Sequence, residues 1–216
     1  MSAHRVRGSD ITVCIPTIPG REEMLASALK SVAEQTLQPA DIVVVNDKAK
    51  RGAYAARNEA IERVKTDWIA LLDDDDLFLP NHLEVLAREA SRGDADLVYP
   101  YMIVDGGRDP LAVTVNMNWV SPFGVTFGQE QERHLRTWGN FIPITYLVKT
   151  EFCRRVGGFP PAESHQRPED HLFLIKLLDA GARFKHVARR TWIYHIHDAN
   201  TGGGLTDPFD KRLATE

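Results

Sequence analysis

The sequence predicts an α/β protein in a single domain, with a mostly parallel β-sheet and helices on both faces. Short apolar runs alternate with amphipathic stretches through the first half of the chain, which is the pattern of strands joined by crossover helices. Polar and acidic residues follow two of these runs, at Asn46-Asp47 and at Asp73 to Asp76, and open sheets bind ligands beyond the carboxyl ends of their strands. The length of 216 residues, with 43% hydrophobic and 26% charged, fits one globular domain.

Apolar runs predict the strands of the first half, and apolar residues at helical spacing predict the helices between them. The predicted strands are residues 11–15, 41–46, 68–72 and 96–104. The predicted helices have their apolar faces at Leu25 to Val32, Ala56 to Val64 and Leu83 to Ala90, the last within residues 80–92. Glu22 and Glu23 favour a helix start, because the positive end of the helix dipole stabilises acidic side chains.

The second half has weaker periodicity. Residues 106–139 show no clear period, which is typical of a long functional loop. Beyond them, residues 143–149 predict a strand, residues 169–180 a helix, and residues 184–196 one or two strands. The sequence contains neither an internal repeat nor a linker that would divide it.

Composition and charge argue against several classes of protein. Lys and Arg number 26 and Asp and Glu 30, so the net charge is −4, without the basic excess of a typical nucleic-acid binder. Cys14 and Cys153 are the two cysteines, too few for a disulfide framework and without a CxxC pair for zinc. Because the sequence shows no apolar leader and no apolar run of roughly 20 residues, we expect a cytoplasmic protein without a membrane span.

The run Asp73 to Asp76 is the strongest chemical signal. If this segment is extended, Asp73 and Asp75 point to one side and Asp74 and Asp76 to the other. Four adjacent carboxylates repel one another, and oxygen ligands on a loop suit a hard divalent ion such as Mg²⁺ or Mn²⁺. The alternative is a solvated acidic turn that only caps the helix starting near Pro80.

The chain resembles a family 2 glycosyltransferase with a GT-A fold. The resemblance rests on short motifs in the family's order: Ile15-Pro16-Thr17 with Arg21, Val43 to Asp47, Arg51-Gly52 with Ala56-Arg57-Asn58, Leu72 to Asp76 with Pro80 and Leu83, Val156 to Phe159, and Glu169-Asp170. It implies a nucleotide-sugar donor, expected to be a UDP-sugar, a divalent metal, and displacement with inversion at the anomeric carbon. It also implies a donor-binding half over residues 1–104, an acceptor and catalytic half over residues 105–200, and a flexible tail over residues 201–216.

The resemblance further implies roles for individual residues. Donor binding is implied for residues that match the family's nucleoside-binding positions, its basic positions near the nucleotide, or the acids of its DxD-type motif. These residues are Pro16, Thr17, Arg21, Asp47, Arg57, Asp73 and Asp74. Metal binding is implied for Asp75 and Asp76, with His197 as a candidate ligand. Asp170 matches the catalytic base, with Glu169 beside it. A single displacement needs such a base near the acceptor hydroxyl and a positive clamp on the leaving diphosphate.

Structural interpretations remain open for several of these residues. Glu169 and Asp170 also fit ordinary acids at a helix N-terminus, and His195 with His197 also fits a structural pair. Thr17 also fits a plain turn residue, and Arg21 and Arg57 also fit solvated helix arginines. Trp119 and Trp138 fit either stacking on an acceptor or packing, and residues 200–204 fit either a lid or a frayed tail.

Two alternative functions share parts of this pattern. A sugar nucleotidyltransferase needs a Gly-rich loop after the first strand, where this chain has a single glycine, Gly20. A non-catalytic nucleotide-sugar-binding protein would not need the acids, and the acids are present. Many relatives have Asp-Asp-Gly-Ser where this chain has Asn46 to Ala49, so the base preference stays open, as does the acceptor.

Overall fold

Seven strands of the described residues form one mixed β-sheet in this computed structural model, which describes residues 5–106, 127–162 and 168–196. The strands are β1 (Ile11–Thr17), β2 (Asp41–Asn46), β3 (Trp68–Leu71), β4 (Leu77–Phe78), β5 (Leu97–Asp105), β6 (Leu147–Lys149) and β7 (Phe184–His195). Their order across the sheet is β2-β1-β3-β6-β5-β7-β4. β1, β2, β3, β5 and β7 run one way, whereas β6 and β4 run antiparallel to their neighbours. The predicted mostly parallel sheet is confirmed.

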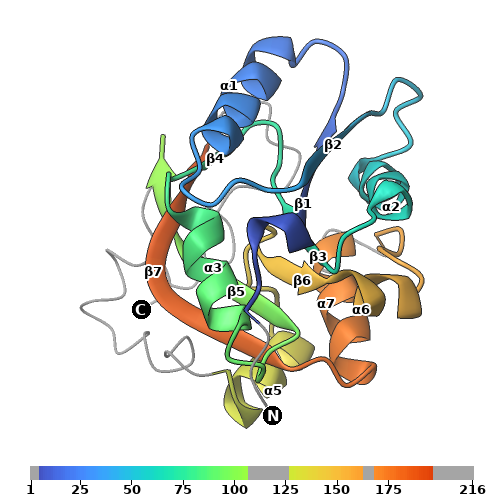
Figure 1. The fold of residues 1–216 in the computed structure, drawn as a ribbon. Coiled ribbons are helices and arrows are strands. Elements are labelled where there is room, and N and C mark those ends of the chain that lie inside the picture. Colours follow the sequence, from blue (N-terminus) through green and yellow to red (C-terminus); the bar gives the residue numbers. More distant parts are fainter. Residues whose placement is uncertain (1–4, 107–126, 163–167, 197–216) are drawn as a thin grey trace, which may run out of the picture.

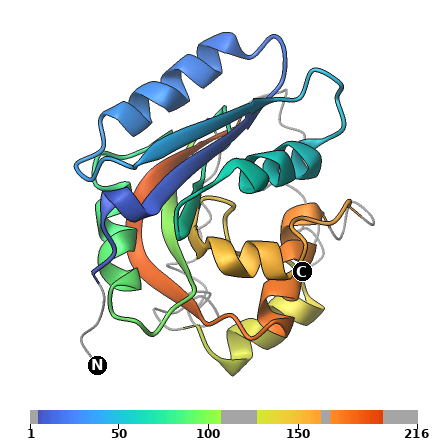
Figure 2. The ribbon, with the colours of Figure 1, turned by 45° about the vertical axis from the view of Figure 1, so that its right-hand side comes forward.

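Helices cover both faces of this sheet, as predicted (Figure 2). The helices are the short η1 (Gly8–Asp10), then α1 (Glu22–Ala33), α2 (Ala53–Arg63), α3 (His82–Ala90), α5 (Gln129–Thr137), α6 (Thr150–Arg155) and α7 (Glu169–Asp179). One core layer packs α1 and α3 against the sheet, and the other packs α2, α5, α6 and α7 against the opposite face. None of these helices combines the length and the apolar character needed to cross a membrane.

The second half differs most from the sequence-based prediction. Helix α5 lies inside the stretch expected to be an irregular loop, so that prediction is wrong for residues 129–137. Six of its nine residues are charged or amide-bearing, and Gln131 and Leu135 are its buried positions, so it has almost no apolar period to detect. β6 was expected, but its antiparallel insertion between β3 and β5 was not, because strand order is decided by long-range pairing. Residues 107–126 of the expected loop lie outside the described residues.

The carboxyl ends of β1, β2 and β3 meet at one edge of the sheet (Figure 1). The parallel register places Thr17 beside Asn46, and the N–H of Asp47 donates to the Thr17 carbonyl at 2.8 Å. The N–H of Leu72 donates to the carbonyl of Cys14 at 3.1 Å, which carries the pairing to the last apolar residue before the acidic run. The segments that follow these three strands therefore start side by side.

The side chain of Asn58 joins α2 to the segment between α6 and α7 by two hydrogen bonds. The amide of Asn58 donates to the Phe159 carbonyl at 2.8 Å and accepts from the Phe159 N–H at 2.7 Å. Gly158 passes so close to Asn58 that a Cβ would collide with its amide oxygen, and its φ of +71° favours glycine as well. These contacts account for Gly158 of the Val156 to Phe159 motif, and they hold α2 against the segment that precedes α7.

Candidate active site

The four consecutive acids after β3 form a tight turn and not an extended segment. The N–H of Asp76 donates to the carbonyl of Asp73 at 3.2 Å, which closes the turn. Carboxylate oxygens of Asp73, Asp75 and Asp76 all lie within 4.8 Å of one another. The expectation that Asp74 and Asp76 share a side is therefore wrong, because the alternation of side chains ends where the chain turns.

Asp74 faces the end of β1 and not the other three acids. Its Oδ2 accepts from the hydroxyl of Thr17 at 2.6 Å, and its Oδ1 accepts from the guanidinium of Arg21 at 2.8 Å. The same Arg21 nitrogen reaches Asp75 at 3.1 Å. Asp74 is 3% exposed, so this carboxylate ties the segment after β1 to the acidic turn. The roles of Thr17, Arg21 and Asp74 in donor binding stay predictions.

Arg57, on α2, joins the acidic turn to the first turn of α7. One guanidinium nitrogen donates to both oxygens of Asp73, at 2.8 and 3.0 Å, and the other donates to Glu169 at 3.0 Å. Burial opposes the charge of Arg57, but Asp73 and Glu169 outweigh it and raise the pKa of the guanidinium. Arg57 is 6% exposed and is not a solvated arginine.

Asp170 and Glu169 are adjacent in sequence but differ in surroundings. Glu169 is engaged by Arg57, whereas Asp170 accepts from the side-chain amide of Asn140 and from the N–H of His171, each at 2.8 Å. Burial raises the pKa of the Asp170 carboxyl above its usual value, although Arg57 and these two donors oppose the rise. A carboxylate whose pKa is moved toward neutrality suits a general base. Sequence reasoning missed Asn140, because an isolated polar residue after Gly139 carries no periodic or motif signal.

Asp76 is the most buried acid of the turn, with 1% exposure. Burial, followed by the charges of Asp73 and Asp75, raises the pKa of its carboxyl to about 9, although the N–H of His195 donates to it at 3.1 Å. The ring of His195 donates from Nδ1 to the Asp75 carbonyl at 2.8 Å, so the end of β7 contacts the acidic turn. Among the described residues, Arg21 forms ion pairs with Asp74 and Asp75, and Arg57 forms an ion pair with Asp73.

Asp47, which directly follows β2, organises its own loop. Its Oδ2 accepts from the N–H of Gly52 at 2.8 Å, and its Oδ1 accepts from the side chain of Arg51 at 3.1 Å. Burial works against ionisation here, but these two donors lower the pKa of the carboxyl. Pro16 is buried in β1, beside Val45 of β2. The expected nucleoside contacts of Pro16 and Asp47 stay predictions.

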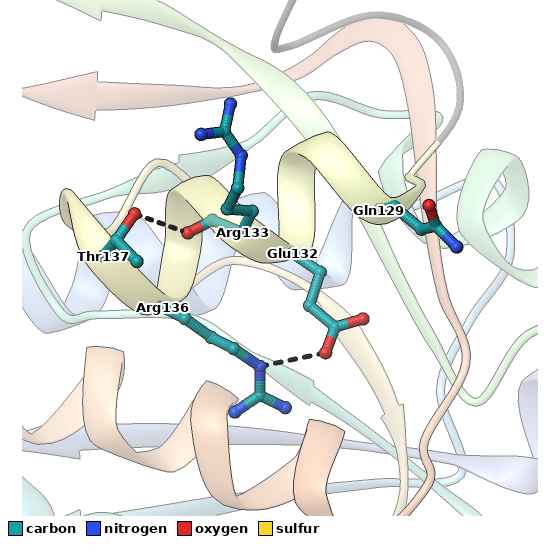
Figure 3. Close-up of a pocket in the computed structure, with 5 residues that line it drawn as sticks. All are labelled: Gln129, Glu132, Arg133, Arg136 and Thr137. Atoms are coloured by element: carbon teal, nitrogen blue, oxygen red, sulfur yellow. Dashed lines mark hydrogen bonds and ion pairs between the residues drawn. The ribbon is translucent and has the colours of Figure 1, made fainter.

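Several sequence-based expectations fall elsewhere. His197, Trp119 and residues 200–204 and 201–216 lie outside the described residues. Trp138 is 65% exposed at the end of α5, which argues against buried packing. Figure 3 shows a hollow on α5 that no predicted site residue lines; its lining residues are Gln129, Glu132, Arg133, Arg136 and Thr137.

Solved structures with a similar fold include two in complex with nucleotide sugars, one of them a mannosyltransferase. S. aureus TarS 1–349 in complex with UDP-GlcNAc superposes with a TM-score of 0.70 at 19% identity, over 88% of this chain and 60% of that one. The mannosyltransferase PcManGT from Pyrobaculum calidifontis, in complex with GDP-Man and Mn²⁺, gives a TM-score of 0.58 at 15% identity, over 88% of this chain and 58% of that one. At these identities the likeness shows the fold alone, and it agrees with the expected GT-A architecture.

Sequence comparison shows the family directly. The family model "Glycosyl transferase family 2" matches residues 48–145. The uncharacterized glycosyltransferase YwdF of Bacillus subtilis (strain 168) is 32% identical over 88% of this chain and 75% of that protein. The succinoglycan biosynthesis protein ExoW of Rhizobium meliloti (strain 1021) is 28% identical over 64% of this chain. That match covers 54% of ExoW, so it spans about half of that protein. The chain belongs to glycosyl transferase family 2.

Proposed function

We propose that this glycosyltransferase moves a sugar from a nucleotide-diphosphate sugar, a UDP-sugar, to an acceptor hydroxyl, with inversion and with a divalent metal. Family membership supports the transfer of a glycosyl group. The UDP-GlcNAc complex of TarS, a protein of the same fold, supports the choice of donor. One observation carries the proposal: Arg57 joins the acidic turn to the helix start that bears Asp170, so the residues that we propose for the diphosphate site and for the base lie close together.

The acidic turn fits a divalent cation by its chemistry. Asp73, Asp75 and Asp76 offer oxygen ligands within 4.8 Å of one another, and oxygen ligands are those that Mg²⁺ and Mn²⁺ prefer. Burial first, and then the charges of Asp73 and Asp75, raise the pKa of Asp76, and a bound cation would favour its ionised form. When bound, Mn²⁺ or Mg²⁺ supplies positive charge that stabilises the leaving diphosphate. We assign its binding to Asp75 and Asp76, with Asp73 beside them; the Mn²⁺ of PcManGT is a precedent in this fold.

The residues of the chain divide the remaining work. Asp170 takes the proton from the acceptor hydroxyl, whose oxygen attacks the anomeric carbon from the face opposite the nucleotide. Thr17, Arg21 and Asp47 line the carboxyl edge of β1 and β2, where we place the nucleoside and the diphosphate. Glu169 is engaged by Arg57, so we assign it to positioning that arginine and not to taking the proton.

Nucleotide binding can be tested by thermal unfolding. Nucleoside diphosphates and their sugars, including UDP-GlcNAc and GDP-Man, are added with Mn²⁺ or with a chelator. A ligand at about one hundred times its Kd stabilises the native state by roughly 2.7 kcal/mol. We expect uridine nucleotides to stabilise the protein only with Mn²⁺, and Asp75→Ala to abolish the effect. No shift with any nucleotide would overturn the donor site and favour a protein that does not bind nucleotide sugars.

The base can be tested by donor hydrolysis, in which water replaces the unknown acceptor. The nucleotide sugar that stabilises the protein most is incubated with Mn²⁺, and release of the nucleotide diphosphate is measured. We expect Asp170→Asn to lower the rate by about a hundredfold or more, since general bases contribute roughly 10²–10⁴-fold. The neighbouring Glu169→Gln variant is the matched control and should retain more activity. Full activity of Asp170→Asn would contradict the assignment of the base.

A further inference from the structure

Helix α5 and the segment that follows it contact the first turn of α7 at two consecutive positions. The side-chain amide of Asn140 donates to Oδ2 of Asp170 at 2.8 Å. Next to this contact, Nε2 of His171 donates to the carbonyl of Leu135, on α5, at 2.5 Å. His171 is 4% exposed and Leu135 is fully buried, so the second contact is part of the core. The contact between Asn140 and Asp170 is therefore held by a fixed framework.

The orientation of the Asn140 amide is determined by its other hydrogen bond. Its Oδ1 accepts from the N–H of Ile142 at 2.9 Å, and a carboxamide oxygen cannot donate. The Nδ2 hydrogens must therefore face Asp170. Because Oδ1 of Asp170 also accepts from the N–H of His171, both carboxylate oxygens meet donors. Two donors on the two oxygens match an ionised carboxylate.

We propose that Asn140 is a positioning residue for the reaction, which holds the Asp170 carboxylate ionised and oriented so that it accepts the proton of the acceptor. This inference rests on the proposed function, in which Asp170 is the base. Asn140 acts through Asp170 and carries no charge of its own. Two contacts fix the Asn140 amide against the Asp170 carboxylate. One is the hydrogen bond from the Ile142 N–H to Asn140, and the other is the hydrogen bond from His171 to Leu135.

Other charged or titratable groups around Asp170 set the background for its titration. Arg57 of α2 favours the ionised form, whereas Glu169 on the same helix disfavours it. The buried phenol of Tyr146, before β6, interacts with Asp170 as well. None of these groups changes when Asn140 is replaced, so an altered titration reports the amide. Loss of a donor to a charged acceptor makes ionisation harder.

The direct experiment is a ¹³C NMR titration of the aspartate carboxyls in the full chain, with Asp170→Asn used to assign the Asp170 signal. We expect Asn140→Ala to raise the titration midpoint of Asp170 by about one unit or more, because a hydrogen bond to a charged group is strong. Asn140→Asp should raise it further, since it keeps an oxygen for the Ile142 N–H and adds a second carboxylate. The exposed Asn81, whose side chain makes no capping bond at the start of α3, gives the control variant Asn81→Ala.

The same variants are then compared by their pH profiles for donor hydrolysis. We expect the acidic limb to move to higher pH in both Asn140 variants, while the thermal shift given by the donor stays as in the wild type. An unchanged midpoint for Asp170 in a folded Asn140→Ala protein would overturn the inference, whatever the outcome for Asn140→Asp. If Asp170→Asn hydrolyses the donor at the wild-type rate, the proposed base fails. If that variant is inactive and the Asn140 profiles do not move, only the positioning role fails.

Discussion

The two edges of the sheet hold buried carboxylates in opposite electrostatic situations. At the amino ends of the strands, Asp96 precedes β5 and accepts from Arg183 at 2.8 and 3.1 Å, and Lys149 lies 2.9 Å from it. Burial raises the pKa of its carboxyl, but Arg183 and Lys149 outweigh burial and hold the pKa well below its usual range. At the carboxyl ends, Asp76 has a pKa raised to about 9.

Both residues are little exposed, Asp96 at 4% and Asp76 at 1%, and burial raises the pKa of each carboxyl, so the opposite direction of the two shifts comes from the charged partners. Asp96 is one carboxylate with two cationic partners. Among the described residues, the acidic turn has four carboxylates and ion pairs with Arg21 and Arg57. The first arrangement stabilises the fold by itself, whereas the second is favourable for a ligand that brings positive charge. This contrast distinguishes a structural ion pair from a candidate active site.

Replacing one arginine at each edge should give the largest difference in the free energy of unfolding between the two edges. Arg57→Met leaves the half-buried Asp73 and Glu169 without their partner, and we expect it to lower the free energy of unfolding by about 2–3 kcal/mol, between the values for exposed and fully buried pairs. Arg183→Met removes a side chain that is 53% exposed, and Lys149 stays, so we expect a loss of about 1 kcal/mol or less. Urea unfolding at pH 7 measures both. Equal losses would show that the edges do not differ as described.

Neutralising one acid at each edge should separate activity from stability. We expect Asp75→Asn to reduce donor hydrolysis by about a hundredfold or more, because it replaces a charged carboxylate of the proposed metal site with a neutral amide. Asp96→Asn should keep the wild-type rate per folded molecule while it lowers the melting temperature. Rates are compared at a temperature where all proteins are folded. A fully active Asp75→Asn enzyme would place the diphosphate site elsewhere.

The last comparison is the pH dependence of the free energy of unfolding, measured in the presence of a chelator. The pKa of Asp76 is about 9 in the folded protein against a usual value of 3.8, so its contribution to stability is complete below about pH 4 and is lost as pH rises toward 9. Asp76→Asn does not titrate there, so its free energy of unfolding should exceed that of the wild type by more near pH 8 than near pH 5.

Asp96→Asn gives the opposite sign in the same titration. Because the folded pKa of Asp96 is depressed, its contribution is present above the unfolded pKa and is lost as pH falls through the folded value. This variant should therefore be less stable than the wild type at neutral pH, and the gap should narrow in acid. Melting temperatures across the pH range measure both variants. The same sign for the two substitutions would contradict the charge balance inferred here.

The amino-acid sequence by itself determined the fold class, the family and the place of the acids along the chain. Continuous apolar runs, such as the one that ends at Leu72, are local signals that need no knowledge of the rest of the structure. Motif order then identified the family, which the match to YwdF shows independently. The roles of the site residues stay predictions, because they concern ligands and reaction steps and not the fold.

Tertiary structure decided which side chains meet. Arg57 pairs with Glu169 across 112 residues, and Asn140 with Asp170 across 30, separations at which no periodicity carries information. A single turn bond placed Asp76 with Asp73 and Asp75, where strand-like alternation predicted otherwise. The physical reason is that periodicity reports which face of an element is buried. The charge balance at an edge of the sheet depends on groups that only the folded chain brings within a few ångströms of one another.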